Sequence, residues 1–290
     1  MKDRIFVIDG SSYLYRAFHA MPPLSTSTGI PTGAIKGVTN MLMTLKKDSE
    51  GSPIIVVFDA KGKTFRNDIF SSYKANRPPM PDDLRSQIEP VKLICKAIGF
   101  PLLIIDGVEA DDVIATVAEK AKNRNLKCVI SSLDKDLMQL VEDPKVSMMN
   151  TMTHQIFDEE KVLDKFGVKP TQIRDLLALT GDSSDNIPGI PKVGQKTAAK
   201  WLNEFENIKN IKSNADSIKG VVGDNLRGFI TDLDRNIELV SLKRDVDLKV
   251  KFEDLLIANP NEDELERIFK ELEFTLSLIH ISEPTRPNCI

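Results

Sequence analysis

Three short apolar runs of the chain each end in an aspartate. IFVID ends at Asp9, IIVVFD at Asp59 and CVISSLD at Asp134. All three runs have the β-branched composition and the length of strands, and side chains at the carboxyl ends of strands in an open α/β sheet face the crevice where ligands bind. The three carboxylates are therefore expected to meet.

Six further acids lie in three short motifs. VEADD opens a predicted helix, LDKD contains the third strand-end aspartate, and GDSSD follows a later predicted helix. Capping or the helix dipole accounts for any one acid alone, but not for so many from separate segments. The predicted set has nine members: Asp9, Asp59, Glu109, Asp111, Asp112, Asp134, Asp136, Asp182 and Asp185.

A cluster of this kind requires cations. Nine carboxylates would repel one another and raise one another's pKa values unless positive charge neutralises them. Oxygen ligands without His or Cys select hard ions such as Mg²⁺ or Mn²⁺, and two ions roughly 4 Å apart serve in-line phosphodiester chemistry. The net charge is −4, but without the nine acids 34 acidic residues face 39 basic ones, which is compatible with an anionic substrate.

A basic and aromatic segment, GKTFRNDIFSSYKANRPPMPDD (62–83), follows the second strand-end aspartate. This mixture suits a single nucleic-acid strand, with its phosphates held by charge and its bases stacked on rings, although a solvated helix with a small core face fits the composition equally well. Lys74 and Arg77 are three residues apart, so on a helix they would share a face and reach over the metal crevice. The other members are Lys63, Phe65, Arg66, Phe70 and Tyr73.

The sequence GIPKVGQKT lies between two predicted helices and resembles a P-loop. Gly189 and Gly194 have the P-loop separation, but Gln195 replaces the required lysine and no strand precedes the motif, so nucleotide hydrolysis is not expected. A glycine-rich turn before a helix presents backbone amides to a phosphate, and Lys192 and Lys196 add charge. A tight turn between helices would share the glycines but would not explain the lysines.

The order of elements predicts two regions and a tail. Strands at 5–9, 54–59, 102–106 and 128–134 alternate with helices near 33–47, 82–98 and 110–123, which indicates a mainly parallel central sheet flanked by helices. Residues 1–169 are therefore predicted to be α/β and residues 170–275 all-helical, with helices near 170–181, 196–205, 224–243 and 263–273. Residues 276–290 fit neither pattern, and we interpret them as a non-native end.

The remaining composition narrows the class of protein. At 290 residues with 41% hydrophobic composition the chain can build real cores. Neither a signal peptide nor a membrane span is expected, because Asp9 ends the first apolar run. Cys95, Cys128 and Cys289 match no zinc spacing and suit a reducing compartment, so a cytoplasmic location is expected.

From about residue 4 to 274 the chain resembles the 5′ nuclease domain of bacterial DNA polymerase I, in the flap endonuclease family. The motifs that carry the resemblance occur in order: DGSSYLYRAFHA, FDAKGKTFR, YKANRPPMPDDLR, GVEADD, LDKD and GDSSDNIPGIPKVGQKTA. The resemblance implies a PIN-like or resolvase-like α/β domain, a helical arch over the site at 62–83, and a helix–three-turn–helix motif near 185–205. It also implies two Mg²⁺ ions, duplex DNA as partner, and a K⁺ ion at the helix–three-turn–helix.

The resemblance assigns roles to particular positions. Asp9, Asp59, Glu109 and Asp111 match ligands of the first metal ion, and Asp134, Asp136, Asp182 and Asp185 match ligands of the second. Asp112 matches a family acid whose role stays open, and Lys74 and Arg77 match residues that engage the scissile phosphate. The positions that correspond to DNA contacts are Arg16, Lys63, Arg66, Tyr73, Gly189, Lys192, Gly194, Lys196 and Thr197.

The expected activity is a Mg²⁺-dependent 5′-3′ exonuclease and 5′-flap endonuclease. Its substrates would be DNA flaps, nicks and RNA primer junctions in lagging-strand replication and repair. A monomer is expected, and no association with a membrane. The chain suggests the amino-terminal part of a DNA polymerase I, although stand-alone flap nucleases exist. Two rivals are a PIN-like ribonuclease and a non-catalytic DNA-junction binder.

Overall fold

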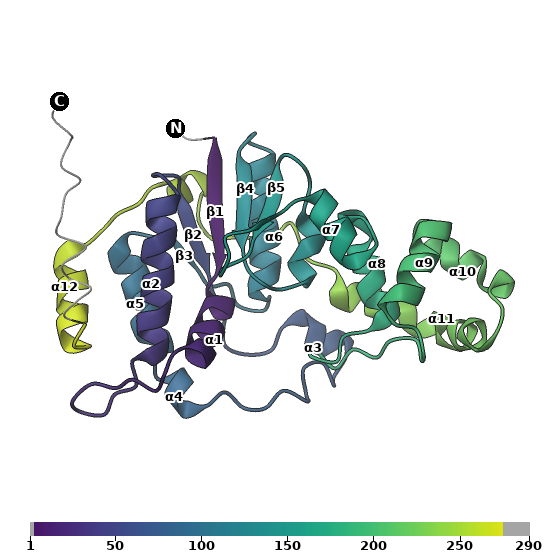
Figure 1. The fold of residues 1–290 in the computed structure, drawn as a ribbon, viewed down its shortest axis with the longest axis horizontal. Coiled ribbons are helices and arrows are strands. Elements are labelled where there is room, and N and C mark those ends of the chain that lie inside the picture. Colours follow the sequence, from purple (N-terminus) through teal and green to yellow (C-terminus); the bar gives the residue numbers. More distant parts are fainter. Residues whose placement is uncertain (1–2, 275–290) are drawn as a thin grey trace.

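A single sheet forms the centre of the molecule in the computed structural model of the chain, which describes residues 3–274 (Figure 1). The strand order is β3-β2-β1-β4-β5-β6, with all neighbours parallel except the antiparallel pair β5 and β6. The predicted mainly parallel α/β sheet is therefore confirmed. The strands are β1 (Arg4–Asp9), β2 (Ile54–Val57), β3 (Leu102–Leu103), β4 (Lys127–Ser131), β5 (Val146–Met149) and β6 (Ile156–Phe157).

Two strands were not predicted, and three are shorter than predicted. β2 ends at Val57 and β4 at Ser131, whereas strands to residues 59 and 134 were predicted. β3 ends at Leu103, whereas the apolar run LLIID suggested a strand to residue 106. β5 and β6 were not predicted, because VSMM lacks the β-branched enrichment of the other strands and β6 has only two residues. Asp9 ends β1 as predicted, whereas Asp59 and Asp134 lie in the loops just after β2 and β4.

Helices cover both faces of the sheet, and successive residues of β1 serve the two cores in turn. Ile5 and Val7 belong to one core, whereas Phe6 and Ile8 belong to the other. This alternation follows from the two-residue period of a strand, and it explains why a strand buried on both faces reads as a continuous apolar run. The helices of this part are α1 (Gly10–Ala20), α2 (Gly33–Asp48), α5 (Ile88–Ile98) and α6 (Ala110–Lys122).

The basic segment after β2 is mostly not helical. It contains α3 (Phe65–Ile69) and α4 (Asp82–Arg85), and the chain between them forms turns and extended backbone. Lys74 has a φ of +56°, which lies outside the right-handed helical region. The helical arch predicted for 62–83 is therefore wrong in its secondary structure, and Lys74 and Arg77 do not share a helical face.

Helices without strands make up the region after β6. α8 packs against α9 and α11, and it also contacts a 3₁₀ helix at Asp136–Leu140 in the α/β part. Figure 1 shows α9, α10 and α11 grouped at the end of the molecule away from the sheet. The helices are α7 (Glu159–Phe166), α8 (Pro170–Thr180), α9 (Gln195–Phe205), α10 (Ile208–Ser213) and α11 (Val221–Val240), with 3₁₀ helices at Ala215–Ser217 and Phe252–Leu256.

The last helix, α12 (Glu262–Glu271), returns to the α/β part and packs on α5 (Figure 1). Leu265, Ile268 and Phe269 are buried in the same core as α1 and α2. The predicted helical region at 170–275 is therefore not a single unit. The predicted tail at 276–290 lies outside the described residues, and none of the helices within 3–274 combines the length and apolar character of a membrane span.

Candidate active site

The three aspartates that follow the strands lie at one edge of the sheet. β2, β1 and β4 are parallel neighbours, so their carboxyl ends coincide. Asp9 is the last residue of β1, and Asp59 and Asp134 lie just beyond β2 and β4. Burial, and then the nearby charges of Asp59 and Asp134, raise the pKa of Asp9 to about 7.

Short hydrogen bonds hold the first two carboxylates. Asp9 caps α1 by accepting from the Ser12 amide at 2.9 Å, and its second oxygen accepts from the Ser132 hydroxyl at 2.8 Å. Asp59 accepts from the Ala110 amide at 2.9 Å, at the start of α6. The capping role considered for such aspartates is thus real for Asp9, and it fixes the carboxylate at the crevice.

Acids from α6 and from the loop after β4 crowd the same place. Burial raises the pKa of Asp111 well above its ordinary range, and the charge of Asp134 raises it further. Burial likewise raises the pKa of Asp136 to about 8, with the charges of Asp134 and Asp182 adding to it. Asp134 is exposed to solvent, yet the protein atoms around it desolvate its carboxylate and raise its pKa as well. Each of these negative charges raises the pKa of its neighbours, so the carboxylates repel one another.

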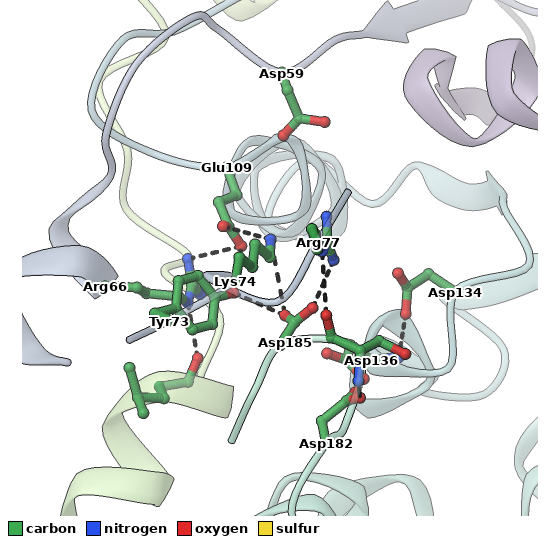
Figure 2. Close-up of polar contacts among 12 residues, drawn as sticks. Asp59, Arg66, Tyr73, Lys74, Arg77, Glu109, Asp134, Asp136, Asp182 and Asp185 are labelled. Carbon is green, nitrogen blue, oxygen red and sulfur yellow. Dashed lines mark hydrogen bonds and ion pairs between the residues drawn. The ribbon is translucent and has the colours of Figure 1, made fainter. Parts of the chain in front are cut away.

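Basic side chains lie among the acids, and Figure 2 shows Lys74 and Arg77 beside Glu109 and Asp185. Lys74 Nζ is 2.6 Å from Glu109 Oε1, and Arg77 Nη2 is 2.5 Å from Asp185 Oδ1. Lys135 Nζ lies 2.9 Å from Asp182 Oδ2. Lys74 and Arg77 thus reach the crevice as predicted for arch residues, although they do so from a turn and as partners of the carboxylates.

Tyr73 joins two of the acid-bearing segments. Its hydroxyl lies 3.0 Å from Glu109 Oε2 and 2.8 Å from Asp185 Oδ2 (Figure 2). Burial, followed by these two negative charges, raises the pKa of Tyr73 far above its usual range, so the phenol is neutral. Only 4% of Tyr73 is exposed. The contact with DNA that was predicted for its ring is therefore not available in this conformation.

Arg66 and Asp112 form a buried pair away from solvent. Arg66 Nη1 and Nη2 donate to the two carboxylate oxygens of Asp112 at 2.7 and 2.9 Å. The same guanidinium donates to the carbonyls of Leu239 and Ser241, and Asp112 also accepts from the Lys243 amide at 2.9 Å.

This pair overturns two predictions. Asp112 is fully buried and its oxygens are already bonded, so it is not available as a metal ligand. Arg66 is 1% exposed, so it cannot contact DNA. Its guanidinium lies 3.4 Å from Glu109 Oε2, and it ties α3 and α6 to the end of α11. The sequence could not reveal this, because a basic residue between aromatics looks the same in a buried pair and on a surface.

The donor set fits a hard divalent cation in its chemistry. The acids offer oxygens only, and Asp136 Oδ1 is buried without a hydrogen-bond partner. In this conformation, however, no three His, Cys, Asp or Glu side chains within residues 3–274 lie close enough together to hold one ion. Side-chain rotation is needed to bring the oxygens together, and Lys74, Arg77 and Lys135 compete for three of the carboxylates.

The glycine-rich turn between α8 and α9 packs tightly against the end of α8 and against α11. A Cβ on Gly189 would lie 1.9 Å from the Thr180 carbonyl oxygen, so the position admits only glycine without a shift. Asn236, fully buried in α11, donates to the carbonyls of Ala178 and Pro188 at 3.1 and 2.6 Å. The turn therefore has a fixed shape.

The residues predicted to hold a phosphate lie where this turn enters α9. Gly194 is the residue before the helix, and the first amides of a helix have no acceptor within it. Lys192 and Lys196 are exposed, and Thr197 is half-buried on the first turn. These positions form a surface with donors and positive charge, as a backbone phosphate requires.

The remaining predicted DNA contacts lie at separate places. Lys63 is exposed in the loop before α3. Arg16 is half-buried on α1 and donates to the Thr151 hydroxyl. Both stay available to a strand that approaches the crevice.

Sequence reasoning missed Lys135 and Ser132. Lys135 stands between two acids in LDKD, and that position could have suggested a pairing with an acid from another segment. Ser132 lies two residues before Asp134, and its hydroxyl donates to Asp9 and accepts from the Asp134 amide at 3.0 Å.

Comparisons with known protein families match nearly the whole described chain. Residues 4–167 match the model of the 5'-3' exonuclease N-terminal resolvase-like domain. Residues 168–263 match the model of the 5'-3' exonuclease C-terminal SAM fold.

Two curated relatives have different lengths. A protein named DNA polymerase I of Pseudomonas aeruginosa is 48% identical over 93% of this chain, but the chain spans only 30% of that protein. A protein named 5'-3' exonuclease of Aquifex aeolicus is 44% identical over 93% of this chain and 92% of its own length.

Solved structures share the fold. The structure described as divalent metal ions (zinc) bound to T5 5'-exonuclease aligns with a TM-score of 0.70 and 24% identity over 93% of this chain and 98% of its own. The catalytic core of Rad2 in complex with DNA substrate aligns with a TM-score of 0.61 and 17% identity, over 96% and 92% of the two chains.

Proposed function

The chain belongs to the 5′-3′ exonuclease family, and from this membership and its acidic crevice we propose that it is a structure-specific nuclease for DNA. It removes 5′ flaps and RNA primers during lagging-strand replication and repair, by exonuclease and flap endonuclease cleavage. The observation that carries this proposal is the crowding of Asp9, Asp111 and Asp136 at the carboxyl ends of parallel strands, which calls for cations.

Two Mg²⁺ ions, with Mn²⁺ as a substitute, fit these oxygen donors. When bound, they supply Lewis-acid activation of the attacking water and of the scissile phosphate. The proposed ligands, direct or through water, are Asp9, Asp59, Glu109 and Asp111 for one ion and Asp134, Asp136, Asp182 and Asp185 for the other. Asp112 is left out of this set because Arg66 already pairs with it.

Lys74 and Arg77 are proposed to hold the scissile phosphate. In the structure both side chains lie in the crevice, but they pair with Glu109 and Asp185. A phosphate group offers a charged partner of the same kind, so the two side chains can exchange a carboxylate for the substrate without leaving the crevice. Positive charge held there stabilises the negative charge that develops on the phosphate during cleavage.

The glycine-rich turn is proposed to grip the DNA duplex. Lys192, Lys196 and the first amides of α9 hold backbone phosphates without reading sequence. A K⁺ ion at this turn, as family resemblance implies, would add to the same grip. Arg16 and Lys63 contact the strand nearer the crevice.

The chain spans about 30% of the DNA polymerase I relative and nearly all of the Aquifex aeolicus relative, so both a polymerase fragment and a separate nuclease fit. We propose a monomer in the cytoplasm in either case. Cleavage requires only the described residues under this proposal.

The test is a 5′-labelled flap substrate incubated with the chain and Mg²⁺. A product cut near the base of the flap that disappears with EDTA supports the proposal. Preference for RNA hairpins over DNA flaps would instead favour a ribonuclease. Binding that is unchanged by EDTA, with no cleavage under any divalent cation, would identify a non-catalytic junction binder.

A further inference from the structure

A second basic site lies beyond the glycine-rich turn. A cavity of about 470 Å³ opens between α9 and the segment that leads into α11, and it is lined by Lys196, Lys200 and Lys219. Figure 1 shows these helices at the end of the molecule farthest from the sheet. Lys200 and Lys219 have no part in the acidic crevice or in the glycine-rich turn, so this surface needs its own explanation.

The three lysines carry charge that the protein leaves uncompensated. All three are exposed, and none forms an ion pair with a carboxylate in the part of the chain that the structure describes. Glu204 is the single acid that lines the cavity, so positive charge dominates there. Some other basic residues of this region are paired: Lys212 Nζ lies 2.8 Å from Asp234 Oδ1.

The backbone beside Lys219 is held in a fixed shape. Arg227 Nη1 donates to the carbonyls of Ala215 and Ile218 at 2.6 and 3.2 Å. A Cβ on Gly223 would lie 1.8 Å from the Ile218 carbonyl oxygen, so the chain can pack this closely only with glycine there. The wall of the cavity is therefore built before a ligand arrives, which lowers the entropic cost of binding.

The arrangement suits an extended anion better than a nucleobase. Lys196 and Lys200 are four residues apart on α9, so they share one face about 6 Å apart along the helix axis. Trp201 and Phe205 also line the cavity, but Trp201 is only 4% exposed and Phe205 is partly buried against the core. Three exposed lysines beside two rings that are largely packed into the core favour phosphates of a paired duplex over unpaired bases.

We propose that Lys200 and Lys219, together with Lys196, bind backbone phosphates of duplex DNA beyond the point where the glycine-rich turn holds it. The inference rests on the proposed nuclease function, because the duplex is part of the same substrate. The acidic crevice lies at the carboxyl ends of the strands, whereas α9 and α11 lie at the end of the molecule away from the sheet (Figure 1), so the cavity adds contacts on the side away from the cut. Its effect is on duplex affinity and not on the chemical step.

The experiment compares Lys200→Ala/Lys219→Ala with the unaltered chain in EDTA, where cleavage does not occur. Fluorescence anisotropy gives the Kd of labelled flap DNA at several salt concentrations. For a long downstream duplex, the slope of log Kd against log salt should be smaller by about 2 in the variant, since each lysine that releases a phosphate counterion contributes roughly one. For a downstream duplex shorter than one helical turn, the two proteins should bind alike.

Two further variants distinguish an effect of the lost charge from an effect of a damaged fold. Lys209→Ala/Lys251→Ala removes the same charge from exposed positions outside the cavity and should keep the full slope. Lys200→Arg/Lys219→Arg keeps the charge and should show the same slope of log Kd against log salt as the unaltered chain. The proposal is overturned if the Ala variant reduces the slope equally for short and long duplexes. It is also overturned if the control variant reduces the slope by the same amount.

Inorganic phosphate tests a smaller occupant. If low concentrations of phosphate protect the unaltered chain against heat but not the Ala variant, while duplex affinity is unchanged, the cavity is a site for a free anion and the proposal is wrong. Cleavage of flaps by the unaltered chain with Mg²⁺ is measured in parallel. Absence of cleavage would count against the proposed function. Intact cleavage together with an unchanged salt slope in the Lys200→Ala/Lys219→Ala variant would count against this inference alone.

Discussion

The ammonium group of Lys74 lies 2.6 Å from Glu109 Oε1 and 3.7 Å from Asp185 Oδ2. A basic side chain from the turn after α3 therefore lies between one acid that precedes α6 and one from the loop after α8 (Figure 2). The same carboxylates are proposed as metal ligands, so the lysine and a divalent cation compete for them. This competition leads to the first prediction.

Divalent cations should expose the bond between Lys74 and Ala75 to trypsin. Binding of Mg²⁺ at Glu109 or Asp185 repels the lysine, which then leaves its ion pair and becomes accessible to the protease. Mass spectrometry of timed digests measures cleavage at this bond with Mg²⁺ and with EDTA. Sites such as Lys249, remote from the acids, should be cut at the same rate in both; equal cutting at Lys74 would contradict the competition.

Replacing Asp111 or Asp134 by Asn should abolish cleavage and leave flap binding nearly intact. Each substitution removes a charge from the set proposed to hold metal, and the expected loss of activity is at least about 100-fold. Initial rates on a labelled flap and Kd in EDTA are compared. Cleavage at the unaltered rate would show that the two-metal assignment is wrong.

The metal-free chain should lose stability as pH rises from about 4 to about 8. Asp9 and Asp136 have an ordinary pKa of 3.8, and in the folded chain their pKa values are about 7 and about 8. The folded state thus binds more protons than the unfolded state in this window, so their stabilising contribution is full below pH 4 and is lost as pH rises through the folded pKa values.

Urea unfolding at a series of pH values in EDTA measures this dependence. The Asp136→Asn variant should show a flatter fall than the unaltered chain, because it has one fewer titrating group. Added Mg²⁺ should reduce the fall in the unaltered chain. A steeper fall in the variant would contradict the raised pKa of Asp136 in the folded chain.

Breaking the pair between Arg66 and Asp112 should strongly destabilise the fold. Either Arg66→Met or Asp112→Asn leaves a buried partner without compensation, at a cost of about 3–5 kcal/mol in the free energy of unfolding. The double variant should lose less than the sum of the two single losses, because it leaves no uncompensated charge. Urea unfolding of all four proteins gives the coupling, and simple additivity would refute the pairing.

Gly189→Ala should destabilise the glycine-rich turn by about 1–3 kcal/mol, because its Cβ would lie 1.9 Å from the Thr180 carbonyl oxygen. Gly194→Ala provides the matched control for stability: no described atom lies within 4 Å of its Cβ position. Thermal unfolding should separate the two variants clearly. Equal melting temperatures would show that the turn can relax around a methyl group.

Much of the fold was predictable because the signals are local. Ile5 to Ile8 read as a buried strand since both faces of the sheet are covered, and the carboxylates at the strand ends were predicted from the parallel topology alone. β5 and β6 were missed because VSMM lacks the β-branched enrichment of the other strands and β6 has only two residues. The helical arch was wrong because Lys74 adopts a positive φ in a turn that packs on the acids.

The sequence by itself determined which residue types gather in the crevice and that positive charge must meet them. Strand-end aspartates, the glycine spacing and the basic segment are properties of short stretches, so their chemistry can be read without coordinates. Only the tertiary structure decided which basic side chain pairs with which acid. Arg66 and Arg77 are alike in sequence, yet burial pairs the first with Asp112 and leaves the second half-exposed beside Asp185, because pairing depends on distances between segments and on access to water.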